Sequence, residues 1–264
     1  MSSEATTDLL EDEVAFAAAE RPEVLILACG AIAREVLAVI SLNGWTHVDV
    51  KCLPAKLHST PEKIAGAVDA KLTELAGSYD RVFVAYADCG TAGALDVVLD
   101  RHGVERLPGA HCYGFLAGND AWDAMQEDEP GTYYLTDFLA RHFEALMVRP
   151  YRFDTNPELI EMMFGNYKRL IYLAQTDDPA LRERAMAAAE LLGLAYEERR
   201  TAYGELQPSL VQFVNVAVGV APKRVTRLSH TRGGAAPEQP GVAPKRVRRF
   251  SLTRGGEPPK EHSA

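Results

Sequence analysis

The sequence contains no run of eighteen apolar residues, which excludes a transmembrane helix of ordinary length. Its acidic first segment, residues 1–21, also lacks a basic stretch followed by an apolar core, so we expect no signal peptide there. These two absences together predict a cytoplasmic protein that makes no membrane contact. Residues 1–21 are interpreted as an acidic leader.

Cysteine is scarce, with four residues in a chain of 264, and no two of them form a closely spaced pair such as Cys-x-x-Cys. A structural zinc site usually contains such pairs, so the pattern does not indicate one. Disulfides are rare in the cytoplasm, where a cysteine is more often a ligand, a catalyst or a core residue. The four cysteines are Cys29, Cys52, Cys89 and Cys112.

Basic residues are fewer than acidic ones and are unevenly distributed. The net charge is −9, yet residues 219–264 carry ten Lys or Arg and three Glu, a net charge of +7, which leaves −16 for residues 1–218. A body with this negative charge repels nucleic acid and anionic membranes. We therefore expect no nucleic-acid binding by the body of the protein.

The basic end of the chain contains a duplicated motif. Residues 219–234 read GVAPKRVTRLSHTRGG and recur at 241–256 as GVAPKRVRRFSLTRGG. Apolar residues are too few here to offset the entropy of ordering, so residues 214–264 are predicted to be a disordered basic tail. Two copies of a motif gain avidity on a multivalent partner. The tail is therefore either an attachment to a scaffold, a shell or another multivalent protein, or a duplication without function.

Residues 22–213 predict an α/β domain. Strands and helices alternate in its first part, which favours a Rossmann-like parallel sheet covered on both faces. The region 113–165 is predicted to be a mostly helical insertion, and a second α/β unit follows it. This unit either extends the first sheet or forms a smaller lobe, which gives two lobes at 22–118 and 119–213. The expected strands are residues 24–28, 47–53, 81–86, 104–107, 169–173 and 194–200.

Three of the cysteines directly follow predicted strands and adjoin a glycine or a turn. Cys29 precedes Gly30, Cys89 precedes Gly90, and Cys112 follows a Pro-Gly-Ala-His sequence. Open α/β sheets bind their ligands at the carboxyl ends of the strands, so these thiols are expected to face one crevice. The remaining cysteine lies inside a strand pattern and is interpreted as a core residue.

Thiolates are preferred ligands of zinc and of iron–sulfur clusters. Cys29, Cys89 and Cys112, coming from three separate loops, are typical of a metal ion or cluster that keeps one coordination position open for a substrate. His111 would be the fourth ligand, would hydrogen-bond a ligand sulfur, or would act in catalysis. The expected cofactor is an iron–sulfur cluster or a single zinc or iron ion. A single reactive or substrate-contacting thiol, and inert packing at crowded turns, are the alternatives.

Other residues are weaker candidates for the same crevice. Asp88, beside Cys89, would act as a base or orient a ligand, or would be an ordinary turn residue. Gly90 and Thr91 precede a predicted helix whose amino terminus can hold an anion, although they lack the P-loop and dinucleotide signatures. Further candidates for contact with a cofactor or substrate are Gly30, Tyr113 and Gln175.

One predicted helix carries Asp137, Arg141 and His142 within about one turn of each other. That spacing places a carboxylate, a cation and an imidazole near one another. A solvated helix face explains the same pattern equally well.

The chain also carries an ordered set of short motifs, namely ACGA, ADCGT, PGAHCY, YLTDFL, FGNY and YLAQ. Together, over about residues 22–213, they resemble an uncharacterised family, domain of unknown function 1638, found in methanogenic archaea and in bacteria, notably alphaproteobacteria. The resemblance implies an association with corrinoid-dependent methyl-transfer systems and so a role in one-carbon metabolism. It includes neither the leader nor the tail.

The hypothesis that follows is a cytoplasmic metal- or iron–sulfur-binding protein, an enzyme acting on a small molecule at a three-cysteine crevice. The alternative is a non-enzymatic accessory or small-molecule-binding protein of a methyltransferase system. Corrinoid or methyltransferase proteins are the partners that the resemblance implies.

Overall fold

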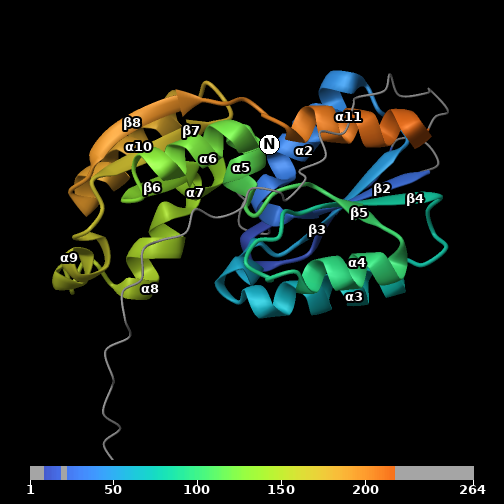
Figure 1. Ribbon diagram of the computed structural model, residues 1–264, viewed down its shortest axis with the longest axis horizontal. Coiled ribbons are helices and arrows are strands. Elements are labelled where there is room, and N and C mark those ends of the chain that lie inside the picture. Colours follow the sequence, from blue (N-terminus) through green and yellow to red (C-terminus); the bar gives the residue numbers. More distant parts are fainter. Residues whose placement is uncertain (1–8, 19–22, 218–264) are drawn as a thin grey trace, which may run out of the picture. The chain divides into compact units, whose positions relative to one another are not determined.

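Two separate sheets organise residues 9–18 and 23–217, the part of the chain that the computed structural model describes (Figure 1). All of these residues belong to one unit, Met1–Lys223. The duplicated motif at 219–234 and 241–256 lies outside the described residues, so the disorder of the tail stays a prediction. Within the described part, no helix is long and apolar enough to cross a membrane.

The first sheet has five strands in the order β1-β3-β2-β4-β5. Only β1 is antiparallel to its neighbour, while the other strands are parallel. The central strand β2 is buried along its whole length, which explains why its sequence VLILAC is apolar without alternation. The chain passes from β2 outward to β3 and then back to β4, so β2 and β4 border a topological switch point. The strands are β1 (Val14–Phe16), β2 (Val24–Cys29), β3 (Val48–Leu53), β4 (Arg81–Ala85) and β5 (Glu105–Arg106).

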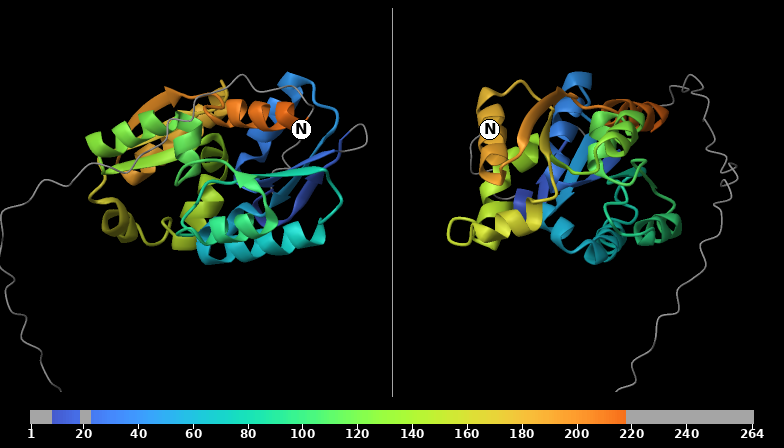
Figure 2. Two further views of the ribbon diagram at one scale, coloured as in Figure 1. Left: turned by 45° about the vertical axis from the view of Figure 1, so that its right-hand side comes forward. Right: turned by 60° about the vertical axis from the view of Figure 1, so that its left-hand side comes forward.

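Helices cover both faces of this sheet. Figures 1 and 2 show α2 and α11 together on one face and α3 and α4 on the other, and within each of these pairs the two helices contact one another. The helices are α2 (Ala33–Asn43), α3 (Ile64–Glu74), α4 (Ala94–His102) and α11 (Leu206–Ala217), with short turns η1 (Gly30–Ile32), η2 (Ala55–Ser59) and η3 (Pro61–Lys63).

The second sheet contains three parallel strands in the order β6-β7-β8. One face, with Tyr134 and Ile171, packs against α6 through Trp122 and Met125 and against α5 through Tyr113. The other face packs against α7, α9 and α10. The elements are α5 (Cys112–Ala117), α6 (Asn119–Asp128), β6 (Thr132–Thr136), α7 (Asp137–Phe143), η4 (Glu144–Val148), α8 (Arg149–Tyr151), α9 (Glu158–Phe164), β7 (Arg169–Ala174), α10 (Pro179–Leu192) and β8 (Ala195–Arg200).

The predicted Rossmann-like α/β architecture is confirmed, and the second unit builds its own sheet. Three elements differ from expectation. β6 lies inside the region 113–165 that was predicted to be mostly helical, β1 lies inside the acidic leader, and α11 continues to Ala217, beyond the predicted start of the tail. The β6 error has a clear cause, because Thr136 ends the strand and also caps α7, accepting a hydrogen bond from the Leu139 N–H at 3.3 Å. With no turn between strand and helix, one apolar pattern continues across both.

Candidate functional site

Three thiols meet at the carboxyl end of the first sheet. A cavity of about 10 Å³ is lined by Cys29, Cys89 and Cys112 together with His58 and Tyr86. The cavity has roughly the volume that one water molecule needs. Its position beside the switch point of β2 and β4 is where open α/β sheets bind ligands. We call this place the thiol crevice.

Cys29 ends β2 and also starts the turn η1. Its Sγ accepts a hydrogen bond from the Ala31 N–H at 3.4 Å. The neighbouring Gly30 allows a close backbone approach, because a Cβ at this position would lie 2.2 Å from the carbonyl oxygen of Leu9. The space beside Gly30 is therefore filled by the chain itself and does not open onto the crevice.

Cys89 lies in a tight turn after β4. Its φ of 52° is left-handed, a conformation that costs a residue with a side chain about 1–2 kcal/mol. Gly90 follows with a φ of 83°, so here glycine serves the turn. The Cys89 N–H donates to the Ala110 carbonyl at 2.9 Å, which ties this turn to the loop that carries Cys112.

Asp88 holds the same turn together. Its carboxylate accepts hydrogen bonds from the Thr91 hydroxyl at 2.8 Å, the Gly93 N–H at 2.8 Å and the Ala92 N–H at 3.1 Å. Burial raises the pKa of Asp88, but these hydrogen bonds outweigh it and the pKa is lowered. Asp88 and Thr91 thus have the contacts of turn residues, and neither lines the cavity.

Two imidazoles accompany the thiols. His58 Nδ1 lies 3.5 Å from the Sγ of Cys29, and its ring stacks on Tyr86 with the centroids 6.4 Å apart. Burial lowers the pKa of His58, yet its interaction with the Cys89 thiol more than compensates and the pKa is raised. His111 Nδ1 lies 3.5 Å from the Sγ of Cys112. Burial, with a contribution from His58, lowers the pKa of His111 to about 4.

Burial controls the protonation of the thiols Cys29 and Cys112 in the thiol crevice. Burial raises the pKa of Cys29 to about 12 and that of Cys112 well above its usual range. Burial likewise raises the pKa of Tyr86 far above its usual value. These groups are therefore protonated at neutral pH. Across residues 9–18 and 23–217, no three Cys, His, Asp or Glu side chains are arranged to hold a metal ion. The three thiols therefore line one cavity, but the described side chains there are not placed as metal ligands.

Two predicted crevice residues lie elsewhere. Tyr113 packs against His111 with ring centroids 4.1 Å apart and against Trp122 at 5.3 Å, and it does not line the cavity. Gln175 follows β7 in the second sheet and accepts a hydrogen bond from the Asp137 N–H at 2.7 Å. Neither residue is available to a ligand in the thiol crevice.

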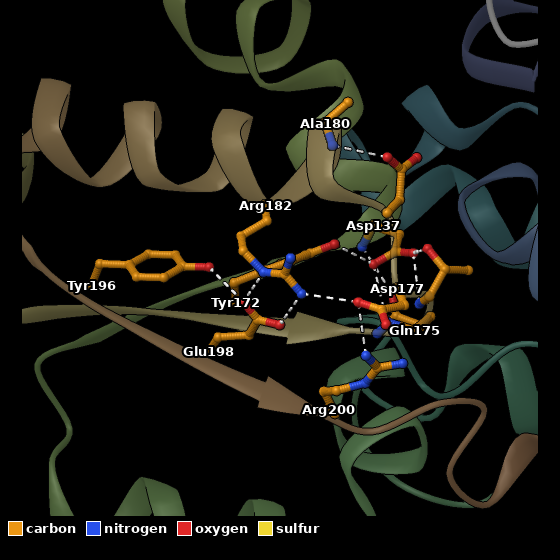
Figure 3. Close-up of polar contacts among 11 residues, drawn as sticks. Asp137, Tyr172, Gln175, Asp177, Ala180, Arg182, Tyr196, Glu198 and Arg200 are labelled. Carbon is orange, nitrogen blue, oxygen red and sulfur yellow. Dashed lines mark hydrogen bonds and ion pairs between the residues drawn. The ribbon is translucent and has the colours of Figure 1, made fainter.

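Asp137 is the centre of a polar network at the carboxyl end of the second sheet (Figure 3). Its carboxylate accepts hydrogen bonds from the Tyr172 hydroxyl at 2.7 Å, the Gln175 N–H at 3.0 Å, and the Thr176 N–H and hydroxyl at 3.0 and 2.5 Å. The nearby Asp177 pairs with two arginines. These contacts join the start of α7 to the loop after β7.

His58 and Tyr86 were missed at the sequence level. Tyr86 follows β4 as Cys89 does, so the strand-end rule that selected the cysteines also points to it. His58 belongs to η2, in a loop between β3 and α3, and its local sequence carries no motif. Only the folding of that loop over the end of the sheet brings the ring to the thiols.

Comparison with known families places these residues in context. A family model described as "Protein of unknown function (DUF1638)" matches residues 52–210. The chain belongs to this family. The predicted resemblance is thereby confirmed, and the matched segment contains Cys89 and Cys112 and begins after Cys29. A comparison with curated proteins gives no match.

Proposed function

We propose that the protein binds a thiophilic metal ion in the thiol crevice and acts there on a small molecule. The observation that supports this is the meeting of Cys29, Cys89 and Cys112, from three separate strand ends, around one cavity. A metal ion held by these thiolates acts as a Lewis acid on a substrate that enters its coordination sphere as an additional ligand. A single ion suits a cavity of about 10 Å³ better than an iron–sulfur cluster does.

The fourth protein ligand in this proposal is His58. Its Nε2 is buried and has no hydrogen-bond partner among the described residues. His111, the candidate from sequence, accepts the Tyr113 N–H with its Nδ1 at 3.4 Å. His58 also lies within reach of two of the thiols, so it is the better placed nitrogen.

Metal binding must displace protons and reorient the thiols. A cysteine binds metal as the thiolate, and burial holds the pKa of Cys29 at about 12 in the metal-free protein. Metal binding therefore releases protons, and the apparent affinity rises with pH. Of the three crevice cysteines only Cys112 is partly buried, so we expect a metal ion to enter from its side.

We would test this with cobalt, whose thiolate complexes absorb strongly. The reduced full chain, handled without oxygen, is titrated with Co²⁺ at pH 6.5, 7.5 and 8.5, followed by elemental analysis of untreated protein. We expect a thiolate-to-cobalt band that strengthens with pH. Replacing Cys29, Cys89 or Cys112 by Ser should weaken binding at least tenfold.

Cys52→Ala is the matched control, because this thiol is buried in β3 outside the cavity. The proposal fails if no thiolate band appears, or if all four variants bind cobalt alike. A folded, metal-free protein of that kind would instead support the alternative of a non-enzymatic accessory protein. The corrinoid or methyltransferase partners stay predictions, to be checked by co-purification with the full chain.

A further inference from the structure

A second pocket lies between the two sheets, and we call it the inter-sheet pocket. Its volume of about 380 Å³ is within the range of small-ligand sites. Its walls come from α2, which follows β2, and from residues that follow β6 and β7, so it lies where parallel strands of both sheets end. The lining residues are Arg34, Glu35, Ala38, Asp137, Arg141, Thr176, Asp177, Asp178 and Tyr203.

Three of the four carboxylates on this wall are already engaged by the protein. Asp137 accepts the hydrogen bonds described above. Asp177 pairs with Arg182 at 3.0 Å and with Arg200 at 2.8 Å (Figure 3). Asp178 caps α10 by accepting the Ala180 N–H at 2.9 Å. These acids serve the fold, so they do not explain the pocket.

Glu35 and Arg141 are different. Glu35 is only 5% exposed, and its Oε2 has no hydrogen-bond partner among the described residues. The Nη1 of Arg141 is buried and likewise lacks a partner within the described part of the chain, while its Nη2 lies 4.0 Å from Asp178. A buried polar group without a partner costs about 1–3 kcal/mol, more when charged. A ligand that bonds both groups recovers that cost.

We propose that the inter-sheet pocket binds a small molecule through its carboxylate group, held by Arg141 with Arg34 beside it, while Glu35 hydrogen-bonds the same ligand. The planar fork of an arginine matches a carboxylate in a bidentate contact. The carboxylates of Glu35 and Asp137 in the same wall disfavour a doubly charged phosphate, because like charges repel strongly where water is excluded. This pocket shares no lining residue with the thiol crevice.

The protonation of Glu35 gives the proposal a distinctive readout. The pKa of Glu35 is raised to about 7, chiefly by burial and also by Asp137, although a backbone hydrogen bond, Arg141 and Arg34 act to lower it. Glu35 also interacts with two further titratable groups, Cys29 at the end of β2 and Tyr203 in the segment just before α11. A bound carboxylate adds another negative charge, so Glu35 should take up a proton on binding. Affinity should therefore fall as the pH rises above about 7.

The experiment uses calorimetry and thermal shift on the full chain at constant ionic strength. The probes are acetate, malonate and succinate, with inorganic phosphate as the competing oxyanion and chloride as the reference salt. We expect saturable binding of at least one carboxylate probe, weakened at least tenfold by Arg141→Met. Affinity for the wild-type chain should decrease from pH 6 to 8.5, and Glu35→Gln should remove that dependence.

Arg149→Met is the matched control, because the Arg149 side chain is 74% exposed and does not line the pocket. If Arg141→Met fails to fold, Arg141→Lys decides, since it keeps the charge but loses the fork and should still weaken binding several-fold. The proposal is overturned if no carboxylate probe binds saturably, if only phosphate binds, or if Arg141 variants bind as the wild type does. The cobalt titration is a separate measurement, so a failure of this proposal is distinguishable from a failure of the metal proposal.

Discussion

Two buried acidic residues of the inter-sheet pocket, Asp137 and Glu35, differ in how their carboxyl oxygens are hydrogen-bonded. Asp137 is 3% exposed, and its two carboxyl oxygens accept four hydrogen bonds. Glu35 is buried to a similar degree but has an oxygen without a partner among the described residues, and burial raises its pKa to about 7. Hydrogen bonding favours the charged form of a carboxyl group and burial alone disfavours it. We therefore interpret Asp137 as structural and Glu35 as functional.

Replacing Asp137 by Asn tests the structural role. The amide NH₂ of asparagine is a donor, and it would face an N–H or O–H that now donates to the Asp137 carboxyl group. At least one of these donors would then lose its partner. We expect a loss of about 3 kcal/mol in the free energy of unfolding, measured by urea denaturation. Asp177→Asn is the control, and it should change stability little because Asp177 is solvent-exposed. Equal stability of the two variants would contradict this assignment.

At the scale of elements, the segment from β2 through η1 to α2 serves both candidate sites. It contributes Cys29 to the thiol crevice and Arg34 and Glu35 to the inter-sheet pocket. Gly30 fixes its path, since the carbonyl oxygen of Leu9 occupies the place of a side chain. The position of both sites thus depends on one close backbone contact with residues 9–11, a helical segment far from the cysteine motif in sequence.

Gly30→Ala should accordingly destabilise the protein. The new Cβ would lie 2.2 Å from the Leu9 oxygen, so one backbone segment must move. We expect a cost of about 2–3 kcal/mol in the free energy of unfolding, as for other overpacked sites. Gly66→Ala is the matched control, because Gly66 lies inside α3 with no atom near its added Cβ, and it should stabilise the chain by about 0.5–1 kcal/mol. Calorimetric melting of both variants checks the sign of each change.

For the molecule as a whole, the end of the described chain completes the core of the first sheet. Leu206, Leu210, Phe213 and Val214 of α11 are buried in that core. Phe213 contacts Phe83 of β4 with ring centroids 4.9 Å apart, and its carbonyl accepts a hydrogen bond from Arg81 at 3.0 Å. The helix that closes the first sheet therefore comes from after the second sheet, which makes the two parts depend on one another.

Truncation separates this helix from the tail. Removing residues 224–264 should leave the melting temperature unchanged, because the first unit ends at Lys223. Removing residues 206–264 exposes the apolar face that α11 covers, and each of its buried large side chains is worth about 1.5–3 kcal/mol. We expect the second variant to lose cooperative unfolding by calorimetry. If the chain without residues 206–264 melted like the full chain, α11 would add nothing to the stability of the core.

The sequence by itself determined the α/β class, most strands, the family and the three strand-end cysteines. Those features are local, because hydrophobic periodicity, turn residues and short motifs are properties of neighbouring residues. The prediction that three thiols share a crevice also held, since parallel strands place their carboxyl ends at one edge of a sheet. The sequence likewise placed Asp137 near Arg141, but left open whether that helix face was solvated.

The tertiary structure alone decided the rest. It brought His58 to the thiols and placed Gln175 at the end of a strand of the second sheet. It also split one apolar pattern into β6 and α7, and brought Arg34 and Glu35 into one pocket with Arg141. Each of these depends on contacts between residues far apart in the chain. Partner choice at that distance is set by packing and by the satisfaction of buried polar groups, and no local pattern records it.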